Sequence, residues 1–504
     1  MKTVLYVKLP CEKIYPGGLT YIADYVHKRN PEVQQTIFDL SLIPTKSQKS
    51  RFIEEIAKTN PDIIAFSWRN IQTFSPHDGT PSLEAIFKFD HSSAIVDKLD
   101  SIYLAGRSFS DFIYQIYRNK SFIALAKKTQ KEATIVVGGT AISCFPERLI
   151  KRFPEDVIAV IGEGERTMLK IIEEQPLDKE NIIFRKNGQI TRYHSTEDLP
   201  LEESTAVDYD YIAKIYPDFY KFRSEYIGIQ TKRGCSFNCS FCMYNIIEGK
   251  RERYRKPQEI VDEVSNLVNN HGYKHVWFTD AQFVASKRSV AYVEETLDLL
   301  IEKNLDLAWT GYVRLENITA NLAKKMLLSG IDSFNLTFIG SQKVIEELHL
   351  GYKLERQLEA FQMIKDAGHT NQMIQLYLPL NSPGETIDTL LETIAHCRDL
   401  YKLFGRENIH PWIFFLGVQN GTPLESSLIE TGYLKEGYNP LSYNPLTIKK
   451  LLYNPQPFGR IIGQAFLEAK RQAVEEDIGR MTLEILEEKL LAEDLSLYPR
   501  SEAA

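Results

Sequence analysis

Strand-like and helix-like segments alternate six times between residues 226 and 418, and no other feature restricts the possible folds as strongly. Short runs rich in β-branched and aromatic residues, such as 226–232 and 373–379, are separated by amphipathic stretches. Strands connected through helices pair in parallel, because the crossover returns the chain to its starting edge. Six such units predict a complete or partial parallel β/α barrel over residues 225–432, with its chemistry in the loops that follow the strands.

A second alternating region, residues 1–175, predicts a doubly wound, Rossmann-like α/β domain. Apolar runs at 62–68, 134–140 and 157–165 end in small residues, and such sheets bind ligands at the carboxyl ends of their strands. A tight turn explains any single glycine there at least as well, but glycines recurring at equivalent places favour a ligand site. The candidate contacts are Gly17, Ser67, Gly138, Gly139, Thr140, Gly162 and Glu163.

Three further segments complete the expected organisation. Residues from about 72 to 125 interrupt the first alternation and are interpreted as an insertion. Residues 176–224 are interpreted as a linker with a small hairpin, because Asn187-Gly188 separates two strand-like runs. Residues 433–504 have helical periodicity and are expected to form a C-terminal helical cap over the open barrel end.

Composition limits the classes of partner. The 504-residue chain has a formal net charge of −7 and no long basic tract, so a nucleic-acid partner is not expected. No apolar run reaches the roughly 18 residues needed to span a bilayer, and the N-terminal apolar run is too short for a secretory signal. We therefore expect a cytoplasmic protein without a membrane partner, whose six cysteines serve metal binding or catalysis more than disulfides.

Half of these cysteines lie in the segment GCSFNCSFC, which follows the first barrel strand. Cys235, Cys239 and Cys242 have the spacing C-x3-C-x2-C. Zinc would usually require a fourth Cys or His nearby or a second paired motif, and His271 is distant in the sequence. Three thiolates on one loop instead suit a [4Fe-4S] cluster that leaves one iron open to an outside ligand.

With this motif at the end of a barrel strand, residues 226–430 resemble the radical S-adenosylmethionine (SAM) superfamily. In that family the three cysteines hold a [4Fe-4S] cluster, and the open iron binds SAM. The resemblance implies that Phe241, the aromatic before the last cysteine, lies next to the adenine of SAM. It also implies SAM contacts from Asp280, Arg314 and Gln375.

Further segments resemble the class of this superfamily that has an N-terminal cobalamin-binding domain, the class B methyltransferase type. They are PGGLTYIADYV (16–26), VVGGTAISCFPE (136–147), VIGEGE (160–165), PGET (383–386) and NGTPLE (420–425). The resemblance extends to about residues 1–430 and assigns the strand-end candidates of the first domain to cobalamin.

The sequence departs from the family pattern at three places. Asp280 is followed by Ala-Gln-Phe instead of a second acid, and Phe338-Ile339 stands where Glu-Ser is usual. The first domain also lacks D-x-H-x-x-G, whose His binds cobalt from below, and His27, His77 and His91 do not have that spacing. Cobalamin is therefore expected to be base-off with no His ligand.

Several candidate residues have two interpretations. Arg314 contacts SAM or substrate, or forms a salt bridge at the barrel rim. Gln375 points into the barrel, or else it packs in the core or forms a strand-end hydrogen bond. Tyr244 faces the radical and the substrate, or packs in the barrel mouth. The basic run 250–256 grips an anionic substrate or, as we prefer, solvates the start of a helix. Cys11, Cys144 and Cys397 are too dispersed for a second cluster, which argues against a methylthiotransferase.

The resemblance implies a cobalamin-dependent radical SAM methyltransferase that acts on an unactivated carbon or phosphorus. The substrate would be a small-molecule or peptide natural-product precursor, and an electron donor such as flavodoxin or ferredoxin would reduce the cluster. Two alternatives remain open. One is an oxidative cyclase or rearrangement enzyme of the porphyrin-cyclase type, and the other is a sensor that binds both cofactors without turnover.

Overall fold

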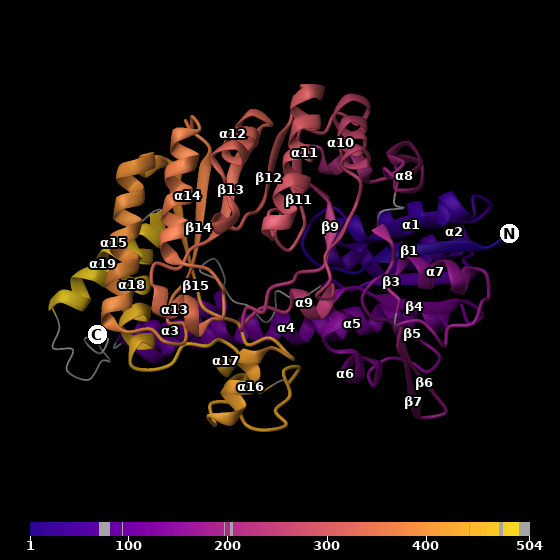
Figure 1. Cartoon of the computed structure of the whole chain (residues 1–504). Coiled ribbons are helices and arrows are strands. Elements are labelled where there is room, and N and C mark those ends of the chain that lie inside the picture. The colour runs from indigo at the N-terminus through magenta and orange to yellow at the C-terminus, as the bar shows by residue number, and fades with distance from the viewer. Residues whose placement is uncertain are drawn as a thin grey trace.

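Two mainly parallel sheets lie side by side in the chain, with helices around each (Figure 1). The computed structural model describes residues 1–69, 81–92, 94–195, 197–201, 205–442, 444–472 and 477–492. Both sheets and the helical C-terminal part agree with the α/β architecture expected from the sequence. That prediction of fold class is confirmed.

The first sheet has seven strands in the order β2-β1-β3-β4-β5-β6-β7. Its first five strands are parallel, and the central ones are apolar on both faces because helices cover both sides. The strands are β1 (Thr3–Lys8), β2 (Gln34–Asp39), β3 (Ile63–Ser67), β4 (Thr134–Gly138), β5 (Ile158–Val160), β6 (Ile182–Lys186) and β7 (Gln189–Tyr193). The helices that belong to it are α1 (Gly17–Arg29), α2 (Gln48–Thr59), α5 (Thr140–Cys144), α6 (Pro146–Ile150) and α7 (Glu165–Ile172).

The hairpin expected within the linker is part of this sheet. Strands β6 and β7 join at Asn187-Gly188, both with positive φ, as a two-residue hairpin turn requires. Strand β6 pairs antiparallel with β5 and extends the sheet at its free edge. The connecting segment that follows contains α8 (Tyr209–Ile215).

The insertion is helical where the structure describes it, with α3 (Pro81–His91) and the 35-residue α4 (Ile95–Thr129). Helix α3 packs far from the first sheet, against the C-terminal part of the chain (Figure 1). The ring of Phe87 lies 5.1 Å from that of Phe415 and 5.4 Å from that of Phe466. The insertion therefore connects the first sheet to the last helices of the protein.

The second sheet has the six parallel strands expected from the alternation, in the order β15-β14-β13-β12-β11-β8. Sequential order without closure makes it a partial barrel. The strands are β8 (Ile227–Ile229), β11 (His275–Phe278), β12 (Ala308–Tyr312), β13 (Ile331–Thr337), β14 (Met373–Pro379) and β15 (Ile409–Phe414). The helices between them are α10 (Pro257–His271), α11 (Lys287–Lys303), α12 (Ala320–Leu328), α13 (Gln342–Glu347), α14 (Leu354–Asp366) and α15 (Ile387–Phe404).

The C-terminal helices cover the edge of the second sheet at β15. Helix α19 packs on β15 and α15, and its Gly479 lies so close to the strand that a Cβ there would be 1.9 Å from the Pro411 carbonyl oxygen. These helices are α16 (Pro423–Glu430), α17 (Pro445–Lys450), α18 (Phe458–Gln472) and α19 (Ile478–Ala492).

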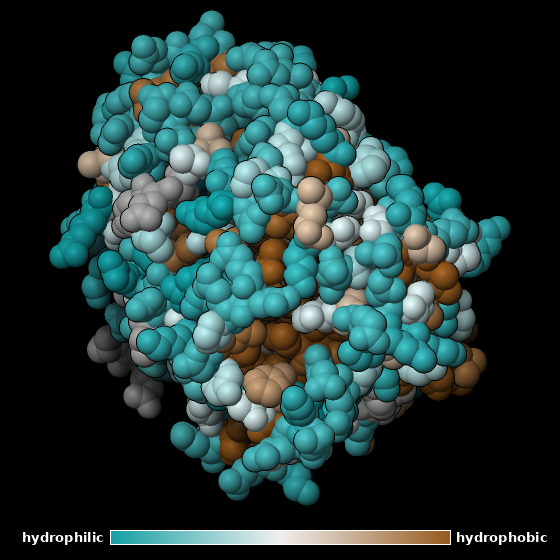
Figure 2. All heavy atoms as spheres, turned by 90° about the vertical axis from the view of Figure 1, so that its right-hand side faces the viewer, coloured by the Kyte–Doolittle hydropathy of each residue, from teal (hydrophilic) through white to brown (hydrophobic). Residues whose placement is uncertain are grey.

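The face of the protein shown in Figure 2 is largely hydrophilic, with apolar side chains gathered in a hollow near its centre. Within the described ranges, no helix combines the length and the apolar character that a membrane crossing needs.

Two helical glycines give a matched test of the C-terminal packing. Gly479→Ala places a methyl group against the Pro411 carbonyl and should destabilise the protein by about 2 kcal/mol, the range expected for overpacking. Gly106→Ala on α4 meets nothing within 4 Å and should stabilise it by up to about 1 kcal/mol through helix propensity. Thermal unfolding of both variants checks this, and equal shifts would contradict the close packing of α19.

Candidate cofactor site between the two sheets

The cysteine segment folds back tightly on the chain that follows it. Gly234 has φ +89°, and a Cβ there would lie 2.0 Å from the Arg251 carbonyl oxygen, so only glycine fits. The Cys235 amide donates to the Gly249 carbonyl at 3.0 Å. A short antiparallel ribbon of β9 (Lys232–Arg233) and β10 (Arg253–Tyr254) closes the base of this loop.

The three thiols lie in a buried environment and influence one another. Burial raises the pKa of Cys235 and Cys239, whereas the Arg314 guanidinium lowers both. Burial raises the pKa of Cys242 to about 12, and the neighbouring Cys239 and Cys235 add to that rise. The thiols would therefore stay protonated on their own, and a positively charged partner is needed to hold them as thiolates.

The residues around the thiols fit a cluster better than a single ion. Among the described residues, no three His, Cys, Asp or Glu side chains converge to hold one metal ion. A cluster presents a separate iron to each thiolate, so the three sulfurs need not converge on one point. The Ser240 hydroxyl and the Gln282 amide oxygen are buried without a hydrogen-bond partner in the described part of the chain. The orphaned hydroxyl of Ser240, which belongs to the cysteine segment, favours a bound group or water beside this loop.

Asp280 holds the backbone that leads into the cysteine segment. Its fully buried carboxylate accepts hydrogen bonds from the Thr231 amide at 2.8 Å, the Thr231 hydroxyl at 2.5 Å and the Lys232 amide at 3.1 Å. Burial raises the pKa of Asp280, and these bonds together with the Lys232 charge oppose that rise. Its contacts here are with the protein, and a contact with SAM stays a prediction.

Arg314 forms the salt bridge that one of its two interpretations predicted, and its contact with SAM or substrate stays a prediction. Its guanidinium forms an ion pair with Glu316 and donates to the Leu350 carbonyl at 2.8 Å. It also lies 3.5 Å above the ring of Phe237, which stands between Cys235 and Cys239. The ion pair with Glu316 thus holds the positively charged Arg314 side chain beside the cysteine loop.

The remaining barrel candidates occupy different surroundings. The Gln375 amide oxygen accepts a hydrogen bond from the Trp412 indole at 2.5 Å. Phe241 is half-buried against the apolar core. Tyr244 begins the short helix α9 (Tyr244–Ile247) and is 37% exposed. Phe338 and Ile339, which replace the usual polar pair, are buried core residues.

The strand-end residues of the first sheet lie at one edge, where Ser67 pairs with Gly138 across β3 and β4. Gly139, which precedes Thr140 at the start of α5, has φ +98°, and a Cβ there would lie 2.7 Å from the Trp68 carbonyl oxygen. Backbone packing alone therefore requires this glycine. The Gly162 amide donates to the Ser143 hydroxyl at 2.9 Å, which ties the loops after β4 and β5 together.

These loops contact the chain just after the last cysteine. The Cys144 sulfur lies 4.0 Å from the Met243 sulfur, and a Cβ on Gly162 would have only the Ile247 carbonyl oxygen nearby, at 3.8 Å. Gly17 lies against β8, since its Cβ would be 3.8 Å from the Gly228 carbonyl oxygen. The fold thus brings the candidate cobalamin loops and the candidate cluster loop together.

Two basic residues have a role that neither interpretation of the run 250–256 anticipated. Arg253 and Arg255 are buried and form ion pairs, Arg253 with Glu163 and Arg255 with Glu263, each at 2.5 Å. For these two residues the preferred interpretation, as charges that solvate the start of a helix, is wrong, because both side chains are buried in ion pairs. Glu163, predicted to contact cobalamin, has its carboxylate engaged by Arg253 and, at 3.5 Å, by Arg233.

Among the histidines considered as cobalt ligands, His27 stacks on Tyr211 at 3.6 Å, His91 lies in α3, and His77 lies outside the described residues. Sequence reasoning omitted Arg69, which follows Ser67 by two positions. Its charge lowers the pKa of Tyr244 and Tyr312 against the larger rise that burial causes, so its side chain lies near both tyrosines. The position of Arg69, two residues after the end of β3, could have identified it, because ligand sites of such sheets lie at the strand ends.

Comparison with known proteins agrees with this arrangement. Residues 229–397 match the family described as the Radical SAM superfamily. An uncharacterized methyltransferase of Pyrococcus horikoshii is 23% identical over 56% of this chain and 61% of its own length. The anaerobic magnesium-protoporphyrin IX monomethyl ester cyclase of Rubrivivax gelatinosus is 25% identical over 56% of this chain and 52% of its own. The chain thus spans little more than half of these relatives.

Among solved structures, the radical SAM methyltransferase TsrM from Kitasatospora setae, with cobalamin and a [4Fe-4S] cluster bound, superposes with a TM-score of 0.65. The match covers 98% of this chain and 100% of that one at 15% sequence identity, which shows a shared fold. Residues 229–397 therefore match the radical SAM superfamily, and the chain as a whole shares the fold of TsrM.

Proposed function

We propose that the protein is a cobalamin-dependent radical SAM methyltransferase. Its substrate would be an unactivated carbon or phosphorus centre in a small-molecule or peptide natural-product precursor. The observation that carries the proposal is the contact of the loops after β4 and β5 with the segment that follows Cys242. Two cofactors held at those places would face a common space, as transfer between them requires.

Each cofactor would be held by residues of its own domain. Cys235, Cys239 and Cys242 would bind the cluster, and the positive charge of Arg314 favours their thiolate forms. At the edge of the first sheet, cobalamin would be cradled by Gly17, Ser67, Gly138, Gly139, Thr140 and Gly162, whereas the Glu163 carboxylate is engaged by Arg253. When bound, the cluster supplies one-electron cleavage of SAM, and cobalamin supplies methyl transfer.

The other named residues would shape the space between the cofactors. Asp280 fixes the backbone that carries the cysteines, while Phe241 and Gln375 are proposed to contact SAM. Tyr244 and Arg314 are proposed to face the substrate, since Tyr244 is exposed beside the last cysteine and Arg314 projects over the same loop. Base-off cobalamin without a His ligand and a flavodoxin or ferredoxin donor complete the proposal.

A second candidate function is an oxidative cyclase, which the names of several relatives favour. Cyclases of Rubrivivax gelatinosus and of Synechocystis both match about half of this chain. The two candidates share the cofactors and differ in the fate of the methyl group of SAM, so the products of the reaction distinguish them.

The cluster assignment predicts a selective effect of cysteine substitution. Cys235→Ala, Cys239→Ala and Cys242→Ala should each abolish the visible thiolate-to-iron absorption and SAM cleavage, because each removes one iron ligand. Cys397→Ala, a buried cysteine on α15, should retain both properties. Iron analysis of anaerobically reconstituted protein checks this, and purified protein that holds one zinc and no iron would refute the assignment.

The cobalamin assignment predicts that substitution of two glycines with nearly the same φ will affect cobalamin binding differently. Gly162 and Gly188 have φ of +75° and +76°, but only Gly162 lies at the ligand edge of the sheet. Gly162→Val should reduce the cobalamin retained through gel filtration, whereas Gly188→Val at the hairpin tip should not. Iron content should be equal in both, and equal cobalamin retention would place the cofactor elsewhere.

The proposed reaction predicts the fate of a labelled methyl group. SAM with a deuterated methyl should give a deuterated product, together with S-adenosylhomocysteine and 5′-deoxyadenosine in comparable amounts. Mass spectrometry of the product and chromatography of the two nucleosides measure these yields. Formation of 5′-deoxyadenosine with an unlabelled product would favour the cyclase, and binding of both cofactors without 5′-deoxyadenosine would favour the sensor.

A further inference from the structure

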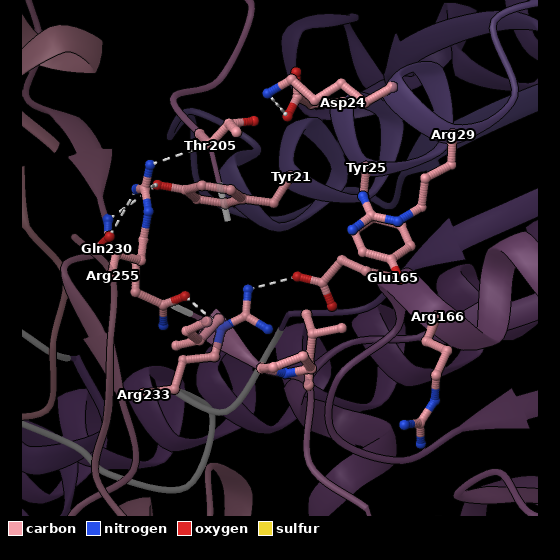
Figure 3. Close-up of a pocket in the computed structure, with 14 residues that line it drawn as sticks. Tyr21, Asp24, Tyr25, Arg29, Glu165, Arg166, Thr205, Gln230, Arg233 and Arg255 are labelled. Atoms are coloured by element: carbon pink, nitrogen blue, oxygen red, sulfur yellow. Dashed lines mark hydrogen bonds and ion pairs between the residues drawn. The ribbon is translucent and has the colours of Figure 1, made fainter. Parts of the chain in front are cut away.

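Four charged residues form a seam between the first sheet and the cysteine loop. We call Glu163, Glu165, Arg233 and Arg253 the charged seam. The two acids flank the start of α7 in the first domain, and the two arginines stand opposite each other in the β9–β10 ribbon. Figure 3 shows Glu165 and Arg233 reaching toward each other across the domain boundary.

The contacts within the seam are short and buried. Arg253 donates to both carboxylate oxygens of Glu163, at 2.5 Å and 3.0 Å, and its side chain is 4% exposed. Arg233 donates to Glu165 at 2.5 Å. Burial alone would raise the pKa of Glu163, but Arg253 and Arg233 together hold it below its usual value. A two-pronged arginine–carboxylate pair fixes orientation as well as distance.

Apolar packing does not fill the boundary beside these pairs. A pocket of about 130 Å³ lies there, and Figure 3 shows the side chains around it. Helix α1 contributes Tyr21 and Tyr25 to its wall, and the second domain contributes Gln230 and Arg255. The Glu165–Arg233 pair forms part of the pocket wall, so a polar contact joins the two domains at this place.

Residues of the charged seam are close in sequence to residues of both candidate cofactor sites. Glu163 directly follows Gly162, and Arg233 is two residues before Cys235. Arg253 also donates to the Glu248 carbonyl at 3.4 Å and to the Leu199 carbonyl at 3.0 Å. A shift at the Glu163–Arg253 pair would therefore move the cysteine loop relative to the loop after β5.

We propose that Glu163 and Arg253 are positioning residues that set the distance and orientation between the cobalamin site and the cluster site. The inference rests on the proposed function. Reaction at one substrate atom needs both cofactors in reach at about 3–3.5 Å, and a misplacement of about 1 Å can cost a hundredfold in rate. Loss of the pair should therefore uncouple SAM cleavage from methylation while both cofactors stay bound.

Glu163→Gln tests this, because it keeps the shape of the side chain and removes its charge. The ratio of 5′-deoxyadenosine to methylated product should rise at least about fivefold, with iron and cobalamin contents equal to those of the wild type. In the cofactor-free protein, amides of residues 160–166 and 249–255 should exchange with deuterium faster. Arg253→Lys keeps the charge but not the two-pronged contact, and should give the same changes to a smaller degree.

Asp97→Asn is the matched control, because it removes an ion pair with Arg471 that also joins distant parts of the chain. It should leave the product ratio and the exchange of both segments unchanged. Wild-type product ratio and exchange in Glu163→Gln and Arg253→Lys would overturn the inference. Loss of cobalamin from Glu163→Gln would also overturn it and make Glu163 a cofactor contact. A wild type without 5′-deoxyadenosine formation would instead refute the proposed function.

Discussion

The hydrogen bonds of Thr231 and Lys232 to the buried Asp280 carboxylate fix where the chain leaves the barrel and enters the cysteine segment. The position of the cysteine segment depends on where the chain leaves the barrel. The loop must then turn at Gly234 with its backbone against Arg251, which leaves no room for a side chain. The ribbon formed by this return carries Arg253 into the first domain and places the cysteines beside the loops after β4 and β5.

Much of this arrangement follows from local patterns in the sequence. The six strands of the second sheet were predictable because each is a short apolar run separated from the next by a helix-length segment. The spacing of Cys235, Cys239 and Cys242 indicated the cluster, since local spacing is enough to place three ligands on one loop. The asparagine-glycine pair at 187–188 likewise predicted its hairpin, although not the sheet that the hairpin joins, because that pairing is with β5, more than twenty residues earlier.

Contacts between distant segments were not predictable in the same way. The run 250–256 resembles a solvated surface, and only the return of β10 across β9 brings Arg253 to Glu163, ninety residues earlier in the chain. The roles of the strand-end glycines also could not be distinguished from the sequence alone. A Cβ on Gly139 would lie 2.7 Å from the Trp68 carbonyl oxygen, whereas a Cβ on Gly162 would lie at an ordinary contact distance of 3.8 Å from the Ile247 carbonyl oxygen, although both glycines follow a strand in the same way.

The six-stranded sheet has two free edges, and both are covered by elements from outside it. Helix α1 of the first domain lies against β8, and helix α19 at the other end of the chain lies against β15. An exposed strand edge is a template for pairing with another molecule. The partial barrel therefore depends on other parts of the chain to cover its edges. A fragment of residues 225–432 would expose the edges of β8 and β15 to pairing with other molecules. Its solubility would therefore depend on segments from the two ends of the polypeptide.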